Sequence, residues 1–190
     1  SNGTHSTKSG LCMTHRFGYN IPHIMDGPPL HIVYVSPEIP QNTGSTARLC
    51  AATGIPLHLV GRLGFRVDDK AVRRAGLDYW KHVNVRLHDT LDDIRRENPS
   101  ARFLYFSKKA GKLYNEADFR PGDYLVFGSE TRGLPAGILD KNADSAFRIP
   151  ILPCVRSLNL ATATGIVVYE ALSRMDFPLY DGFMQMDNAG

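Results

Sequence analysis

Short apolar runs, rich in β-branched and aromatic residues, recur along the chain and alternate with segments of helical pattern. The runs at residues 30–36 and 102–107 predict strands buried on both faces, because a strand with one solvent-exposed face alternates apolar and polar residues. Further strands are predicted at residues 57–60, 124–127 and 146–149, with a weaker one at 83–87. Strands that alternate with helices predict an α/β fold with a mostly parallel sheet flanked by helices.

Helices are expected between these runs. Asn42 is expected to cap a helix that stops at Gly54, and Thr90 to cap a helix that ends near residue 98. A short helix over 135–141 with proline in its first turn and a long apolar helix over 160–175 complete the set.

The pattern divides the chain into three parts. Residues 1–29 are rich in Gly, Ser, Thr, His and Pro without an apolar period, which predicts a flexible N-terminal arm. Residues 30–175 form the single domain, and residues 176–190 form a C-terminal tail that contains aromatic residues.

Composition adds exclusions. With 43% hydrophobic and 22% charged residues the chain is typical of globular proteins. No apolar run approaches the roughly 20 residues of a membrane helix, and the N-terminus lacks the pattern of a secretory signal, so we expect a cytoplasmic protein without a membrane partner. Three cysteines without C-x-x-C spacing and dispersed histidines predict neither a disulfide framework nor a metal site.

Positive charge is concentrated in one segment, although the net charge is only +3. Lys70, Arg73 and Arg74 would share one face of a short helix, with Arg66 before them and the aromatic pair at 79–80 after them. A basic face beside aromatics suits phosphate contact and base stacking, so these four cations are candidate RNA-binding residues. The alternative is a merely solvated face.

Three loops carry the candidate chemistry, since the chain lacks the phosphate loop, the G-x-G-x-x-G fingerprint and the G-x-S-x-G elbow. They are residues 107–112, 128–135 and 150–159, and each follows a predicted strand. Loops at the carboxyl ends of parallel strands converge on one crevice, so we expect the three loops to meet. In the third, Pro150 and Pro153 prevent regular structure; a ligand turn and a stiff connection with Ser157 as a simple helix cap are both compatible with it.

Three motifs in these regions carry a resemblance. N-T-G-S-T-A-R (42–48), F-G-S-E-T-R-G-L-P (127–135) and R-I-P-I-L-P-C-V-R-S-L-N-L-A (148–161) resemble the motifs of the SPOUT RNA 2′-O-methyltransferases. D-D-K-A-V-R-R-A-G-L-D-Y (68–79) and the minimal size are similar to the TrmL type, which methylates the wobble nucleotide of tRNA. One departure is Cys154-Val155, where relatives often carry a polar pair.

The resemblance implies a sheet whose C-terminal part is threaded into a deep trefoil knot, a homodimer, a tRNA partner and S-adenosylmethionine as cofactor, with S-adenosylhomocysteine as product and no metal. The cofactor would be held largely by backbone groups. The residues implied for this role are Phe106, Ser107, Gly128, Glu130, Gly133, Ile149, Ser157 and Leu158.

The resemblance also implies catalytic roles. Arg48 would grip the target phosphate and orient the ribose, since a guanidinium keeps its proton and makes a poor general base. Glu130 would orient Arg48 or a motif amide. Asn42 belongs to the first motif, and Ser157 and Asn159 would order the third loop. The structural alternatives are Asn42 as a helix cap and Glu130 as a surface acid.

Tyr169, in the last helix, is expected to serve core or dimer packing rather than catalysis. Three functions remain open: 2′-O-methylation of the tRNA wobble ribose, the same reaction on ribosomal RNA or another tRNA position, and RNA binding without turnover.

Overall fold

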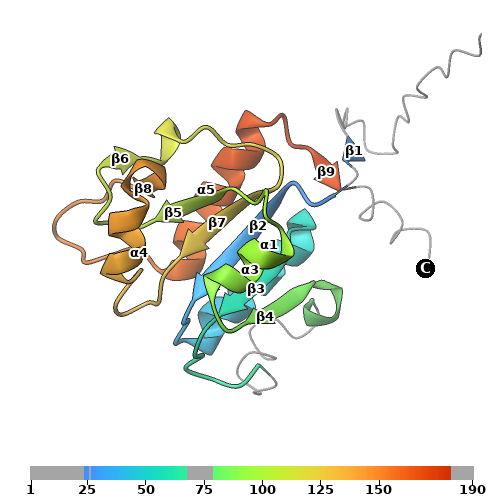
Figure 1. Ribbon diagram of the computed structural model, residues 1–190, viewed down its shortest axis with the longest axis horizontal. Coiled ribbons are helices and arrows are strands. Elements are labelled where there is room, and N and C mark those ends of the chain that lie inside the picture. Colours follow the sequence, from blue (N-terminus) through green and yellow to red (C-terminus); the bar gives the residue numbers. More distant parts are fainter. Residues whose placement is uncertain (1–23, 26, 68–78, 181–190) are drawn as a thin grey trace, which may run out of the picture.

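A seven-stranded parallel sheet forms the centre of the computed structural model, which describes residues 24–25, 27–67 and 79–180 (Figure 1). The sheet order is β4-β3-β2-β7-β5-β8-β6, and every pairing within it is parallel. Its strands are β2 (Leu30–Val35), β3 (Leu57–Val60), β4 (Val85–His88), β5 (Phe103–Phe106), β6 (Lys112–Leu113), β7 (Asp123–Phe127) and β8 (Ala146–Arg148). The predicted α/β class with a mostly parallel sheet is confirmed.

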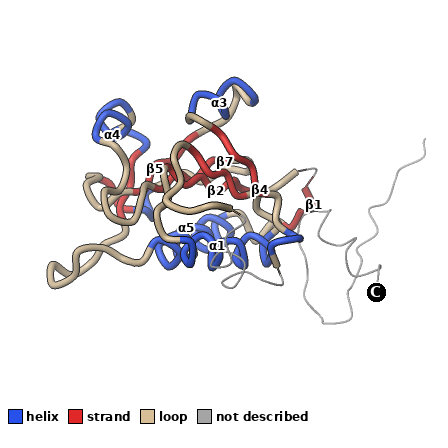
Figure 2. Tube along the Cα trace, turned by 90° about the horizontal axis from the view of Figure 1, so that it is seen from below, coloured by secondary structure: helices blue, strands red, loops and turns tan. Residues whose placement is uncertain are grey.

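Helices cover both faces of the sheet. Helices α1 and α5 lie on one face, and α3 and α4 lie on the other (Figure 2). The helices are α1 (Pro40–Thr53), α3 (Leu91–Glu97), α4 (Ala136–Lys141) and α5 (Leu160–Arg174), with 3-10 turns η1 (Trp80–His82), η2 (Tyr114–Glu116) and η3 (Ala143–Ser145).

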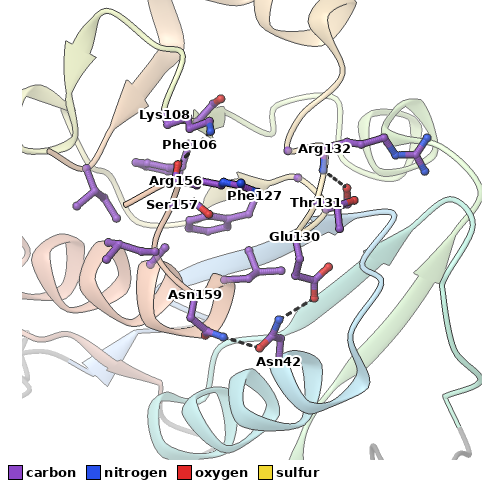
Figure 3. Close-up of a pocket in the computed structure, with 18 of the residues that line it drawn as sticks. Asn42, Phe106, Lys108, Phe127, Glu130, Thr131, Arg132, Arg156, Ser157 and Asn159 are labelled. Carbon is purple, nitrogen blue, oxygen red and sulfur yellow. Dashed lines mark hydrogen bonds between the residues drawn. The ribbon is translucent and has the colours of Figure 1, made fainter. Parts of the chain in front are cut away.

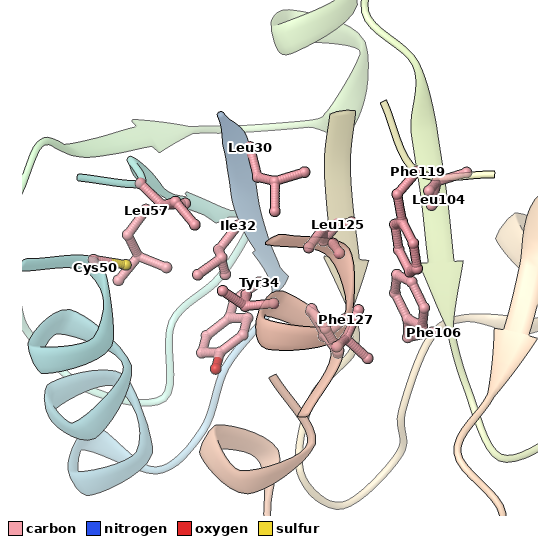
Figure 4. Packing of buried hydrophobic residues seen from close by; sticks show 14 of the residues in the cluster. Leu30, Ile32, Tyr34, Cys50, Leu57, Leu104, Phe106, Phe119, Leu125 and Phe127 are labelled. Atoms are coloured by element: carbon pink, nitrogen blue, oxygen red, sulfur yellow. The ribbon is translucent and has the colours of Figure 1, made fainter. Parts of the chain in front are cut away.

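Strand β2 shows why the apolar runs were continuous. Leu30, Ile32 and Tyr34 pack under α1 and α5 (Figure 4). Val33 and Val35 point to the opposite face, where they join a second cluster with residues of α3 and α4. Since successive side chains of a strand face opposite sides, a strand covered on both faces must be apolar at nearly every position.

The capping residues of two helices differ from the prediction. Helix α1 begins at Pro40, with Ile39 as its cap, so Asn42 lies inside the first turn and its prediction as a helix cap was wrong. Proline suits the first helical position because it has no N–H to leave unpaired. Helix α5 is capped by Asn159, whose side chain accepts from the Thr162 amide, so the alternative of Ser157 as the cap was also wrong.

Other boundaries follow the prediction closely. Gly54 ends α1 in the left-handed conformation, and Thr90 caps α3 in a reciprocal capping box with Asp93. Helix α4 begins one residue after Pro135, and β4 begins two residues later than expected. Strand β6 begins at the last residue of the predicted loop 107–112; a strand of two residues is too short to show a period.

The Tyr34 hydroxyl joins β2 to the two helices of one face. It lies 2.5 Å from the Thr46 hydroxyl in α1 and 2.8 Å from the Thr164 hydroxyl in α5. Burial of the ring raises the pKa of Tyr34, so the phenol stays protonated. Three hydroxyls therefore satisfy one another inside an apolar layer and fix α1 against α5.

Three histidines form a row across neighbouring strands on the other face. The His31 and His58 rings are joined by a 3.0 Å nitrogen–nitrogen contact, and His58 and His88 by another of 3.0 Å. His31 stacks on Tyr124, and Glu97 lies 3.6 Å from His88. Burial lowers the pKa of His31 to about 4 and that of His58 to about 3, so both are neutral near pH 7.

The two ends of the described chain meet in a separate pair of strands. β1 (Ile24–Met25) pairs in parallel with β9 (Leu179–Tyr180). Most of the predicted N-terminal arm and the end of the predicted tail lie outside the described residues. Within the described part, no helix is long and apolar enough to cross a membrane.

Candidate active site

The three loops predicted from the sequence line one pocket of about 590 Å³ (Figure 3). They follow β5, β7 and β8, which are neighbours in the sheet. Because the strands are parallel, their carboxyl ends lie at one edge and their loops open on the same side. The predicted convergence of the loops is confirmed.

All residues that the resemblance assigned to the cofactor line this pocket. Beyond them, the lining includes residues that the sequence analysis did not select. The predicted set is Phe106, Ser107, Gly128, Glu130, Gly133, Ile149, Ser157 and Leu158, and the additional set includes Lys108, Lys109, Ile151, Arg132 and Arg156. The signal for the two lysines was their place in the predicted loop 107–112, directly after β5.

The loop after β7 is folded tightly on itself. A Cβ placed on Gly128 would lie 2.0 Å from the carbonyl carbon of Gly133 and 2.1 Å from the Leu134 nitrogen. Gly133 has φ +68°, and its amide donates to the Ser129 carbonyl at 2.8 Å. Glycine at 128 is thus required by the loop's own backbone, which presses against it.

A hydrogen-bonded chain links three of the predicted catalytic residues. The Asn159 amide donates to the Asn42 side-chain oxygen at 2.8 Å, and the Asn42 amide donates to Glu130 at 2.9 Å (Figure 3). Asn159 also caps α5, while Asn42 belongs to the first turn of α1. The chain therefore fixes both helix starts and the loop after β7 in one arrangement.

Glu130 also takes the place of a helix cap. Its carboxylate accepts from the backbone amides of Glu38, at 2.7 Å, and Ile39, at 3.1 Å. These amides sit at the start of α1, where N–H groups lack helical partners and attract negative charge. Of the two roles left open for Glu130, the structure shows the contact with a motif amide, that of Asn42.

Glu38, in the segment before α1, contacts the loop after β7 in turn. It accepts from the hydroxyl of Thr131 at 2.6 Å and lies 3.6 Å from the Arg132 guanidinium. The hydrogen bond from Thr131 is the largest effect that lowers the pKa of Glu38. Two carboxylates thus join the segment before α1 and the loop after β7 reciprocally.

Arg48 lies elsewhere. It is not among the residues that line the pocket, and its side chain is exposed on α1. It donates to the Tyr79 hydroxyl at 3.2 Å and lies 4.8 Å from the centre of that ring. The structure therefore separates Arg48 from Asn42, Glu130, Ser157 and Asn159, which all line the pocket.

The candidate RNA-binding segment is described only in part. Arg66 is exposed and lies in the loop after β3. This loop contacts the segment before α1, because the Gly64 amide donates a hydrogen bond to the Pro37 carbonyl at 2.9 Å. Lys70, Arg73 and Arg74 lie outside the described residues. A Cβ on Gly64 would lie 2.8 Å from the Glu38 backbone, so the two segments are in close contact.

Tyr169 is 50% exposed and its ring centre lies 6.5 Å from that of Phe177, which is 47% exposed. It is therefore not a core residue of this chain. Within the described residues, no cluster of three or more His, Cys, Asp or Glu side chains could hold a metal ion.

Residues 29–169 match the SpoU rRNA Methylase family, a span that contains α1 and all three loops. The chain belongs to this family. Among curated relatives, the tRNA (cytidine(34)-2′-O)-methyltransferase of Escherichia coli K12 is 47% identical over 151 residues, which covers 78% of this chain and 96% of the relative. The enzyme of the same name from Saccharophagus degradans is 47% identical over 148 residues, 77% of this chain and 96% of the relative.

Solved structures share the fold. One, described as giving insights into the 2-OH methylation of C/U34 on tRNA, has a TM-score of 0.74 at 47% identity and covers 79% of this chain and 99% of its own. Another, an AdoMet-bound rRNA methyltransferase from Sinorhizobium meliloti, has a TM-score of 0.70 at 26% identity and covers 80% of this chain and 59% of its own.

Proposed function

We propose that this protein methylates the ribose 2′-hydroxyl of the wobble nucleotide, position 34, of a tRNA, with S-adenosylmethionine as methyl donor. The observation that carries the proposal is the pocket in which the Asn159–Asn42–Glu130 chain meets three loops at the carboxyl ends of β5, β7 and β8. Two relatives that are aligned over 96% of their own length are named for this activity, which supports tRNA as the substrate and position 34 as the site of methylation.

The pocket fits the cofactor in size and in chemistry. Its volume lies within the range of small-molecule sites, roughly 300–1,000 Å³. Apolar side chains suit the adenine ring, and polar groups of the loops suit the ribose and the amino-acid part. The apolar lining includes Phe106, Phe127, Ile149, Ile151 and Leu158. When bound, the cofactor supplies an activated methyl group on its sulfonium.

The residues of the chain then have to place the ribose 2′-hydroxyl of the RNA against this methyl group and keep water away from both. Asn42, Glu130 and Asn159 keep the loops and the two helix starts in a fixed arrangement, while Ser157 presents its hydroxyl at the pocket wall. Arg48 grips the phosphate of the target nucleotide and orients the ribose, as its fixed fork of donors allows.

A homodimer reconciles the positions of these residues. Arg48 lies on exposed α1 surface away from the pocket of its own chain, and Tyr169 and Phe177 leave an aromatic surface at the end of α5. We infer that Arg48 of one subunit faces the pocket of the other, and that α1 and α5 contribute to the interface. The deep trefoil knot, formed where the loop after β8 enters α5, belongs to this proposal.

The basic segment from Arg66 onward would bind the tRNA near the site, and a cytoplasmic location accords with a tRNA substrate. Incubation of the purified protein with labelled S-adenosylmethionine and tRNA tests the proposal, with the modified nucleotide mapped by nuclease digestion. Transfer to ribose 34 is expected. Transfer to ribosomal RNA or to another tRNA position would reassign the substrate, and RNA binding without transfer would exclude the enzymatic function.

A further inference from the structure

The charges around the pocket are strongly unbalanced. Four cationic side chains line it, from Lys108, Lys109, Arg132 and Arg156, against a single carboxylate, that of Glu130. Glu130 already accepts from three N–H donors. It is therefore committed to the loop structure, and the cations have no counterpart on the pocket wall.

The cations differ in their own contacts. Arg132 is 3.6 Å from Glu38, and the Lys108 ammonium donates to the Arg156 carbonyl at 3.0 Å, which leaves two of its protons for other acceptors. Within the described part of the chain, the side chains of Lys109 and Arg156 form no hydrogen bond or ion pair, and both are exposed. Lys108 and Arg156 lie on the side of the pocket away from Asn42 (Figure 3).

The proposed cofactor does not account for this charge. S-adenosylmethionine carries a sulfonium, an ammonium and one carboxylate, and thus a net positive charge near pH 7. One cation suffices for its carboxylate, and the remaining cations repel the rest of the molecule. A second ligand with several negative charges, bound at the pocket mouth, would neutralise the cations and reduce this repulsion.

We propose that Lys108, Lys109 and Arg156 form a binding site for the phosphates of the RNA backbone that flank the target nucleotide. The inference rests on the proposed function and adds a contact region on the far side of the pocket from the Arg66 segment. RNA phosphates bind Lys and Arg side chains with release of counterions, which makes exposed, unpaired cations well suited to this role.

A consequence is that RNA and cofactor assist each other's binding. Phosphates at the pocket mouth neutralise the cations that otherwise oppose a positively charged cofactor. Coupling between two ligands is reciprocal, so the cofactor must raise RNA affinity by the same factor.

The first test measures tRNA affinity at several salt concentrations for Lys109→Gln, Arg156→Gln and the double variant. We expect about tenfold weaker binding for the double variant, and a slope of log K against log salt that falls by about 0.7–0.9 for each removed cation. Lys141→Gln is the matched control, because it removes an exposed cation of α4 on the other face of the sheet. Equal losses in the control and in the pocket variants would overturn the proposal.

The second test compares S-adenosylmethionine with S-adenosylhomocysteine, which lacks the methyl group and the sulfonium charge. Calorimetry is performed with and without a tRNA that carries a 2′-deoxy target nucleotide. For the wild type, RNA should raise affinity for S-adenosylmethionine more than for the neutral product, and the double variant should lose this difference. If the double variant weakens cofactor binding but leaves tRNA affinity and its salt slope unchanged, the cations hold the cofactor carboxylate and the proposal is wrong.

Failure of the phosphate site can be distinguished from failure of the proposed function. A wild-type protein that binds neither cofactor form, or that transfers no methyl group to any RNA, contradicts the function itself. A wild type that methylates tRNA while the double variant keeps the wild-type salt slope contradicts only the phosphate site.

Discussion

Glu130 shows how one side chain can serve structure and site together. Its carboxylate binds two backbone amides at the start of α1 and the side-chain amide of Asn42, so three donors converge on two oxygens. Each of these bonds has a charged acceptor, which makes it stronger than a neutral one. The position of Asn42 therefore depends on the charge of Glu130 as well as on its shape.

We expect Glu130→Gln to lower methyl transfer about 100-fold, because glutamine offers one acceptor oxygen and turns an N–H group toward a donor. The free energy of unfolding should fall by about 2 kcal/mol. Single-turnover rates and urea unfolding measure the two effects. Asp144→Asn, at an exposed carboxylate with only a 3.8 Å contact to Lys112, is the control and should leave both unchanged; a Glu130→Gln rate close to that of the control would remove Glu130 from the site.

At the residue scale, the sequence indicated which residues line the pocket better than it indicated their contacts, although Arg48 lies outside the lining. Asn42, Glu130 and Asn159 could be selected from motifs, but their mutual hydrogen bonds join positions 88 and 117 residues apart. No local pattern encodes such a contact. The cap prediction for Asn42 failed for the same reason, since a distant carboxylate binds the amides that a local cap would have bound.

The loop after β7 is the element whose backbone is most constrained. Alanine at 128 would place its Cβ inside the Gly133–Leu134 backbone, which cannot yield as a flexible side chain could. Gly137, in the first turn of α4, meets nothing within 4 Å of an added Cβ. Two glycines nine residues apart in sequence thus have opposite tolerance.

Gly128→Ala should destabilise the fold by about 3 kcal/mol or more, because the loop must open to make room for the alanine side chain. Cofactor binding should be abolished, since the opened loop no longer forms the pocket wall. Gly137→Ala should stabilise α4 by about 0.5–1 kcal/mol through helix propensity. Thermal unfolding and cofactor titration of the two variants provide the comparison. Similar stability of both variants would show that the loop can shift without cost.

At the element scale, prediction succeeded wherever burial governed the pattern. The strands of the sheet interior are apolar at nearly every position because both faces are covered, so β2, β3, β5 and β7 could be recognised. Strands β1, β6 and β9 could not, because a strand of two residues has no period and depends on a partner far along the chain.

The proposed dimer predicts complementation between two inactive variants. Arg48→Ala and Asn159→Ala should each lose transfer when alone, while Arg48→Ala keeps cofactor binding. The mixed dimer, isolated after co-expression with two affinity tags, should recover about half of the wild-type activity, since one of its two sites is complete. Methyl transfer by this isolated dimer is compared with that of each variant alone. A mixed dimer as inactive as the two variants would place Arg48 at the pocket of its own chain.

The histidine row predicts a pH dependence for the whole fold. The pKa values of His31 and His58 are lowered to about 4 and about 3, whereas unfolded histidine titrates near 6.5. Below pH 6.5 the unfolded chain takes up protons that the folded chain excludes. The contribution of these histidines to the free energy of unfolding is therefore fully present above pH 6.5 and is lost as the pH falls toward 4. The lowered pKa of His31 alone corresponds to a loss of about 3 kcal/mol over this interval.

Urea unfolding at pH 7.5, 6.5, 5.5 and 4.5 follows this loss. The double variant His31→Phe, His58→Leu should show a flatter profile between pH 6.5 and 4.5, and His82→Gln, at an exposed histidine, should retain the wild-type slope. A double variant with the wild-type slope would assign the pH dependence to other groups.

The hydrogen bond from Asn159 to Asn42 joins positions 117 residues apart. During synthesis, the first motif therefore leaves the ribosome long before the residues that complete its pocket exist. A nascent chain has α1 and β2 but no cofactor site until the start of α5 has emerged, so the cofactor cannot assist the early steps of folding. Under the proposed function, methyl transfer is restricted to chains that extend past the start of α5, and a translation product truncated before Asn159 would be inert.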